Sequence, residues 1–397
     1  MRAVASPSFT SSKMKFMFEL MLKCVEQSMR FFEEKNSDFL ILEMKDTFGR
    51  ITNDVFATTH FGVECDSLKE RNNEMFLMGE RGVDFGGFWI KVRYVLIQMF
   101  PSITRVLGIR VFDQAVNKFF KRLVKENIKY REQHGVVRSD LIHLLINVAN
   151  EKQENNSNEV ENTNYIAEKG SGPTLKKERR KNVKLTDEDI TAFAAYELAL
   201  QPEVQERLQN EIDDALINCN GRVTYEMLMQ MKYLDMVVSE TLRKWPGGFF
   251  LDRCCVKPYT IDPINSGEVP IHLRKGDSVW LSLYALHREP RFYPDPEKFV
   301  PERFSEENKS IIHPYAYMPF GIGPRHCIGN RFALMEAKLV LVHLLSRYNV
   351  RVVEKTVIPI RLERRNFQLT SKDGFWLGLE RRIPGFSLHQ TVESKGL

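Results

Sequence analysis

One stretch, residues 320–329, constrains this 397-residue chain more than any other. It reads Phe-Gly-Ile-Gly-Pro-Arg-His-Cys-Ile-Gly and leads directly into a helical pattern. Gly321 and Gly323 permit a tight turn and a close approach of the backbone to a flat ligand. Cys327 stands just ahead of the predicted helix, where backbone N–H groups and the helix dipole favour a thiolate over a thiol.

The same loop carries an anion-binding side chain. Arg325, two residues before Cys327, is predicted to point across the turn, where it can pair with a carboxylate. A thiolate that ligates iron, next to an arginine that holds a propionate, is the combination that haem requires. The alternative is a buried structural cysteine at a helix start, which is the usual role of an isolated cysteine. The fixed spacing of Phe320, Gly323, Arg325, Cys327 and Gly329 favours the haem ligand.

This loop resembles the haem-binding loop of the cytochrome P450 family, Phe-x-x-Gly-x-Arg-x-Cys-x-Gly. The resemblance implies a mainly α fold with small β-regions, a single domain over residues 1–397, and haem b as cofactor. The cofactor-binding positions that it implies in the loop are Phe320, Gly321, Gly323, Arg325 and Gly329, with Cys327 as the axial ligand of the haem iron.

A second pattern, Glu-Thr-Leu-Arg, lies in an apolar helix predicted over residues 233–245. Its Glu240 and Arg243 are three residues apart and share one helix face, and such a pair needs further partners if it is buried. The resemblance supplies Arg303, from the Pro-Glu-Arg-Phe motif at 301–304. It implies that these three side chains form a structural network behind the haem.

Two further arginines are implied to hold haem propionates together with Arg325. Arg253 lies in the segment after the predicted helix, in Leu-Asp-Arg-Cys. Arg2 aligns with the arginine of the family's Trp-x-x-x-Arg motif through the similar stretch at residues 6–11. Other stretches match insect microsomal members of the family-nine type, so the resemblance covers essentially the whole chain.

The chain departs from the family in two places, and we therefore expect an incomplete cytochrome P450 fold. It begins inside the family's C helix, without the N-terminal anchor and the first β-sheet. The helix after residue 186 lacks the Ala-Gly-x-(Asp/Glu)-Thr motif and is shorter by roughly eighteen residues, or about five turns. The catalytic acid and threonine are thus not found, and the neighbours of Thr191 do not fit it as a replacement.

Composition narrows the class of partner. The net charge of +5 is a mild excess that fits an acidic protein or an anionic membrane surface. No dense basic stripe with interleaved aromatics occurs, which argues against nucleic acid. The six cysteines have no framework spacing and indicate free thiols in a reducing compartment.

The composition of two segments predicts their structure. Residues 85–112 are apolar and aromatic with scattered basic residues, which favours buried helices, although a lid that touches a membrane interface is the alternative. Residues 151–183 are polar and poor in apolar side chains, and they indicate a disordered internal loop.

The resemblance implies a haem-thiolate monooxygenase that oxidises small lipophilic substrates, including xenobiotics by analogy, with O₂ and NADPH-derived electrons. Its expected partners are NADPH-cytochrome P450 reductase and the cytosolic face of the endoplasmic reticulum, or microsomal, membrane. One alternative is a catalytically impaired or non-catalytic haem-binding fragment of such an enzyme. Another is a haem-thiolate isomerase or dehydratase that needs no O₂.

Overall fold

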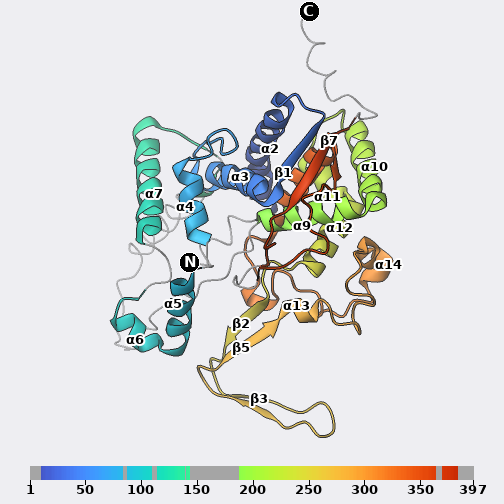
Figure 1. Cartoon of the computed structure of the whole chain (residues 1–397). Coiled ribbons are helices and arrows are strands. Elements are labelled where there is room, and N and C mark those ends of the chain that lie inside the picture. The colour runs from blue at the N-terminus through green and yellow to red at the C-terminus, as the bar shows by residue number, and fades with distance from the viewer. Residues whose placement is uncertain are drawn as a thin grey trace, which may run out of the picture.

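The computed structural model describes residues 10–83, 87–109, 114–138, 140–143, 187–363 and 369–382. Helices dominate these residues (Figure 1). Arg2 and the loop predicted over residues 151–183 lie outside them.

The first half of the chain is helical apart from one strand. Its elements are α2 (Ser11–Glu34), β1 (Phe39–Glu43), α3 (Met44–Phe56), the π-helix η2 (Ala57–Phe61), α4 (Glu74–Val83), α5 (Phe88–Met99), α6 (Pro101–Val106) and α7 (Gln114–His134). The second half opens with four helices, α9 (Asp187–Leu200), α10 (Pro202–Asn218), α11 (Tyr225–Gln230) and α12 (Lys232–Lys244). The strands β2 (Phe250–Cys254), β3 (Tyr259–Ile261), β4 (Ile271–Leu273) and β5 (Ser278–Ser282) follow. The remaining elements are α13 (Leu283–Leu286), the 3₁₀-helix η3 (Pro301–Phe304), α14 (Glu306–Lys309), the 3₁₀-helix η4 (Gly323–Arg325), α15 (Asn330–Leu345), β6 (Tyr348–Arg351) and β7 (Trp376–Arg381).

The largest sheet joins distant parts of the chain. Its order is β1-β7-β6, and both pairings are antiparallel, with Phe39 opposite Glu380 and Glu43 opposite Trp376. The sequence pattern predicts one helix over residues 38–60, and that prediction is wrong at its start. The run Phe-Leu-Ile-Leu-Glu is a strand because β7, more than 300 residues later, offers it a ladder of backbone partners.

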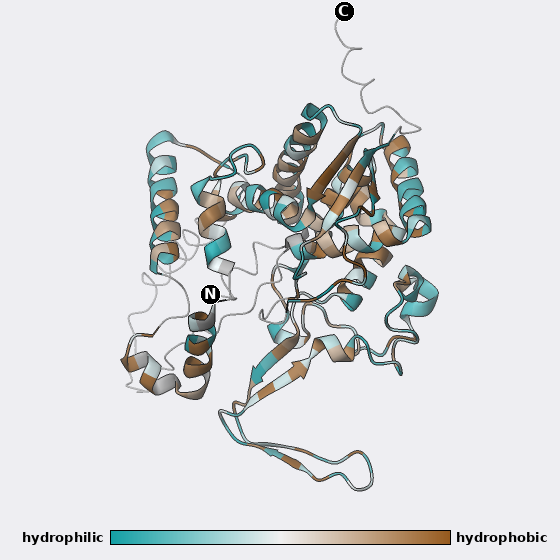
Figure 2. Ribbon diagram, in the orientation of Figure 1, coloured by the Kyte–Doolittle hydropathy of each residue, from teal (hydrophilic) through white to brown (hydrophobic). Residues whose placement is uncertain are grey.

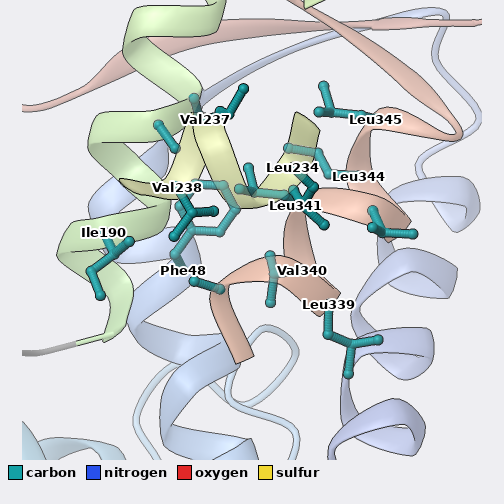
Figure 3. Close-up of a cluster of buried hydrophobic side chains, with 14 of the residues drawn as sticks. Phe48, Ile190, Leu234, Val237, Val238, Leu339, Val340, Leu341, Leu344 and Leu345 are labelled. Carbon is teal, nitrogen blue, oxygen red and sulfur yellow. The ribbon is translucent and has the colours of Figure 1, made fainter. Parts of the chain in front are cut away.

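Four helices meet in the hydrophobic core (Figure 3). Phe48 of α3, Ile190 of α9, Val238 of α12 and Leu341 of α15 are each at most 1% exposed. The side chains at positions 189–199 of α9 are all buried, so this short helix is surrounded by protein along its described length. Burial on every side replaces the amphipathic stripe of a surface helix.

Charged groups in α9 find partners inside this core. Asp189, 3% exposed, lies 2.9 Å from the Nζ atom of Lys45 on α3. Glu197 accepts a hydrogen bond of 2.7 Å from the indole Nε1 of Trp245, whose ring stacks on Phe193 at 4.7 Å. Buried carboxylates need such partners, because desolvation otherwise penalises their charge.

Helices α5 and α6 leave most of their described apolar side chains exposed, whereas Ile90, Val92 and Ile97 are half-buried. The prediction of buried helices over residues 85–112 is therefore wrong for this stretch, which is predominantly hydrophobic (Figure 2). No helix among the described residues has the length and hydropathy that crossing a membrane requires. The exposed apolar side chains here are Trp89 (69%), Val95 (47%), Leu96 (36%), Met99 (65%), Phe100 (46%), Ile103 (57%), Val106 (87%) and Leu107 (66%).

Two small sheets precede the cysteine loop in the sequence. Strand β2 pairs with β5, with Arg253 opposite Val279, and β3 pairs with β4 in a hairpin that projects from the body (Figure 1). The β2–β5 ladder orients Arg253, because neighbouring strand positions face opposite sides of a sheet.

Candidate haem site

The Cys327 loop is held by its own backbone. The N–H of Gly321 donates to the carbonyl of Met318 at 2.9 Å, and the N–H of Cys327 donates to the carbonyl of Phe320 at 2.8 Å. Gly321 and Gly323 have φ angles of +74° and +76°, a region that residues with a Cβ rarely adopt. Glycine is therefore a structural requirement at these two turns.

Cys327 is partly buried and lies just before the 16-residue helix α15. Gly329 forms the N-cap, and the N–H of Ala333 donates to its carbonyl at 3.0 Å. The prediction of a cysteine directly before a helix is confirmed. The unpaired N–H groups at such a helix start carry partial positive charge and stabilise a thiolate.

The guanidinium of Arg253 approaches this loop from strand β2. A Cβ placed on Gly321 would lie 3.7 Å from the Nη2 atom of Arg253 and 3.6 Å from the Cδ2 atom of Leu251, so strand β2 packs against the loop. Arg325 is exposed, and neither it nor Arg253 has an ion-pair partner among the described residues. Guanidinium groups without an ion-pair partner, in and against the cysteine loop, match a ligand that carries carboxylates.

The donor set fits haem. A thiol at a helix N-terminus is a suitable iron ligand. No atom lies within 4 Å of where a Cβ on Gly323 or Gly329 would be, so the backbone is accessible at both positions. Arg2, the third propionate candidate, lies outside the described residues.

A buried charge network lies between α12 and the segment that precedes the cysteine loop. Arg243 donates from Nε and Nη2 to the two carboxylate oxygens of Glu240 at 2.7 and 2.8 Å, and both side chains are 0% exposed. The Nε atom of Arg303 lies 3.4 Å from Glu240, whose Oε1 atom also accepts the backbone N–H of Val300 at 2.9 Å. The structure thus brings together the three residues that the sequence singles out.

This network extends to a residue that sequence reasoning missed. The Nη1 atom of Arg243 donates to the carbonyl of His287 at 3.0 Å. The imidazole Nε2 of His287 in turn accepts the backbone N–H of Met318 at 3.1 Å. Because the N–H of Gly321 donates to the carbonyl of Met318, His287 links the charge network to the cysteine loop. The sequence contains a signal for His287, because a histidine that follows apolar residues, as in Ala-Leu-His, needs a hydrogen-bond partner when it is buried.

His287 is held in its neutral form. Its side chain is 0% exposed, and burial together with the neighbouring Arg243 lowers its pKa to about 4. A neutral imidazole keeps the lone pair on Nε2 with which it accepts the N–H of Met318.

Helix α9 begins at Asp187, in the region where the resemblance to the family calls for a dioxygen-activating acid and threonine. Thr191 is 3% exposed inside α9, and Asp189 on the same helix is paired with Lys45. The described residues of α9 run over 14 positions, Asp187–Leu200. The structure assigns no dioxygen-activating acid and threonine among them.

A cysteine ahead of a helix, glycine turns and flanking arginines together define a haem-thiolate protein. Comparison with known proteins agrees, since the model of the family "Cytochrome P450" matches residues 1–377. The chain belongs to the cytochrome P450 family, whose members are haem-thiolate monooxygenases. The predictions of family, of a mainly α fold with small β-regions and of a haem cofactor are confirmed.

The relatives are insect proteins. Cytochrome P450 9e2 of Blattella germanica is 43% identical over 417 residues, which cover 96% of this chain and 74% of that relative. Probable cytochrome P450 9f2 of Drosophila melanogaster is 37% identical, with 96% and 73% covered. Cytochrome P450 6k1 of Blattella germanica is 34% identical, with 94% and 72% covered. The first alignment is longer than the 397 residues of this chain, so that relative has internal positions that this chain lacks.

The Glu240→Gln substitution should destabilise the protein by about 3–5 kcal/mol, because it leaves buried Arg243 without its counter-charge. The matched control is Glu380→Gln, which removes a pair with Arg351 that is 43% and 45% exposed and should cost less than about 1 kcal/mol. Urea unfolding of the full chain measures both losses. Equal losses for the two variants would contradict a special role for the network.

The lowered pKa of His287 predicts a pH-dependent stability. Below the ordinary value of 6.5 the unfolded chain protonates this imidazole, whereas the folded protein does so only near pH 4. The free energy of unfolding should therefore be complete above pH 6.5 and fall as the pH is lowered towards 4. The His287→Gln variant keeps an acceptor but does not titrate, so its slope in this window should be shallower by up to about 1.4 kcal/mol per pH unit.

Urea unfolding between pH 4.5 and 7.5 checks this difference. His343, whose pKa burial lowers to about 3, is present in both proteins and contributes equally to each. Identical slopes for the original protein and His287→Gln would show that folding does not shift the pKa of His287.

Proposed function

We propose that this chain inserts one oxygen atom from O₂ into small lipophilic substrates while Cys327 holds haem b. The observation that supports this most is the preformed loop that presents Cys327 at the start of α15. When bound, haem supplies dioxygen activation, and its thiolate ligand favours O–O cleavage.

The residues of the chain then have separate roles. Cys327 would hold the haem iron through its thiolate, whose charge the N-terminus of α15 stabilises. Arg325, Arg253 and Arg2 would hold the propionates by charge-assisted hydrogen bonds. Glu240 is a structural residue, because its buried carboxylate is enclosed by Arg243, Arg303 and the backbone N–H of Val300.

Family members generally receive electrons from redox partners such as a reductase and bind lipophilic substrates. For this chain we assign NADPH-cytochrome P450 reductase as the electron donor, docked on the cysteine side of the haem. Xenobiotics are the substrate class that we propose, by analogy at the level of the family. The comparisons do not favour a non-catalytic fragment.

Cys327→Ser should abolish the carbon-monoxide difference band that marks thiolate-ligated haem, since a serine hydroxyl does not replace the thiolate. Cys254→Ser, a free cysteine on β2, is the matched control and should retain the band. The haem-loaded chain with reductase should then oxidise a lipophilic probe in an NADPH-dependent way. A normal band without any turnover would contradict the proposed activity and indicate a haem-binding protein without the chemistry.

We also propose a place on the cytosolic face of the endoplasmic reticulum membrane, with α5 and α6 against the lipid. These helices expose contiguous apolar side chains together with Arg93. Exposed apolar and aromatic groups with basic neighbours suit the membrane interface, where they leave water and meet anionic lipids. This proposal is the alternative given above for residues 85–112, a lid that touches a membrane interface.

Paired Trp89→Glu and Met99→Glu substitutions should weaken sedimentation with anionic phospholipid vesicles by about tenfold or more, because charges replace the buried apolar contacts. Ile311→Glu, at a position 79% exposed on another part of the surface, is the control and should leave sedimentation unchanged. Equal vesicle binding by all variants would rule out α5 and α6 as the contact.

A further inference from the structure

A cavity of about 790 Å³ lies along helix α2 and outside the Cys327 loop. Three separate parts of the chain line it: α2 itself, the stretch 58–65 that includes the end of η2, and residues 136–138 after α7. Its volume is within the range of small-molecule sites, about 300–1,000 Å³. Neither the haem site nor the proposed activity accounts for it.

The side chains that α2 contributes to the cavity change in polarity along the helix. Phe16 and Leu20 line the end near the start of α2, whereas Lys23 and Arg30 line the part further along the same helix. At 1.5 Å per residue, Phe16 and Arg30 are about 21 Å apart along the helix axis. A long molecule with an apolar body and a charged head matches this arrangement.

The charges of the lining leave a cationic excess. Glu64 forms an ion pair with Arg138, and the Nη1 atom of Arg138 lies 3.3 Å from the carboxylate of Glu64. Among the described residues, neither Lys23 nor Arg30 has an ion-pair partner. Glu19 is the remaining acid on the wall, and it lies at the apolar end, between Phe16 and Lys23.

Neutral side chains separate the two cations on α2. Cys24 lies between Lys23 and Arg30 on the helix; it is 8% exposed, and burial raises its pKa to about 11, so its thiol is neutral. On the facing stretch the thiol of Cys65 donates to the Oδ1 atom of Asp54 at 3.1 Å, and burial raises its pKa as well. Neutral groups at these positions do not compete with an anionic head group for Lys23 and Arg30.

We propose that this cavity binds an elongated amphipathic anion, with an acyl chain against Phe16 and Leu20 and a carboxylate at Lys23 and Arg30. The two cations attract the head group, and burial of the chain supplies the rest of the affinity. The site is separate from the haem pocket, so the chain has two places for lipophilic molecules.

The test measures binding of dodecanoate to the full, haem-loaded chain by equilibrium dialysis. Dodecanoate should bind at least about tenfold more tightly than dodecanol or dodecyltrimethylammonium, because only it offers an anion to the two cations. The double variant Lys23→Glu and Arg30→Glu should lose at least about tenfold in affinity, whereas Lys129→Glu on the exposed face of α7 should not. Leu20→Trp fills the apolar end without changing charge and should also weaken binding.

A second readout locates the ligand. Bound dodecanoate should slow hydrogen–deuterium exchange of the backbone amides at residues 58–65, followed by mass spectrometry, and should leave exchange in the β3–β4 hairpin unchanged. Equal binding of dodecanol, or unchanged affinity in correctly folded Lys23→Glu and Arg30→Glu protein, would overturn the proposal. Binding that shifts the haem spectrum, survives these substitutions and leaves exchange at residues 58–65 unchanged would place the anion in the haem pocket and overturn it as well.

Discussion

The carboxylate of Glu240 is the group on which the haem side of this protein depends. It is fully buried, and two arginines and one backbone N–H surround it. Removing two or three charges from water is costly, so the arrangement is tolerated only because each group meets partners of good geometry. These contacts hold α12, η3 and the segment that leads to Cys327 in fixed positions relative to one another. Through His287, the same contacts set the position of the cysteine loop.

The two sides of the haem site are built differently. The cysteine side is made of local turns, a helix start and a charge network that lie within about a hundred residues of one another. Helix α9 is fixed in another way, since its described residues are packed into the core and its Asp189 is paired with Lys45. Helix α9 keeps its place because Phe193 and Glu197 hold it against Trp245. The cysteine loop and α9 therefore depend on separate sets of contacts.

Sequence reasoning predicted the features that depend on local chemistry. The helix after Cys327, the glycine turns and the pairing of Glu240 with Arg243 follow from residue type and spacing alone. It failed where the outcome depends on distant partners. The sequence of β1 predicts part of a helix, because its hydrogen-bond partners in β7 are far away in the chain. The exposure of α5 and α6 depends on which helices pack against them. His287 was missed because its role is to accept the N–H of Met318, a contact between segments 31 residues apart.

The cysteine loop has a thermodynamic consequence for its cofactor. Its turns at Gly321 and Gly323 are already formed, and Met318 is already held by His287. The entropy of ordering this loop is lost during folding of the chain and not during association with the cofactor. Preorganisation of this kind strengthens binding by lowering its entropic cost. Substitution of His287, which is fully buried, would therefore weaken the retention of haem.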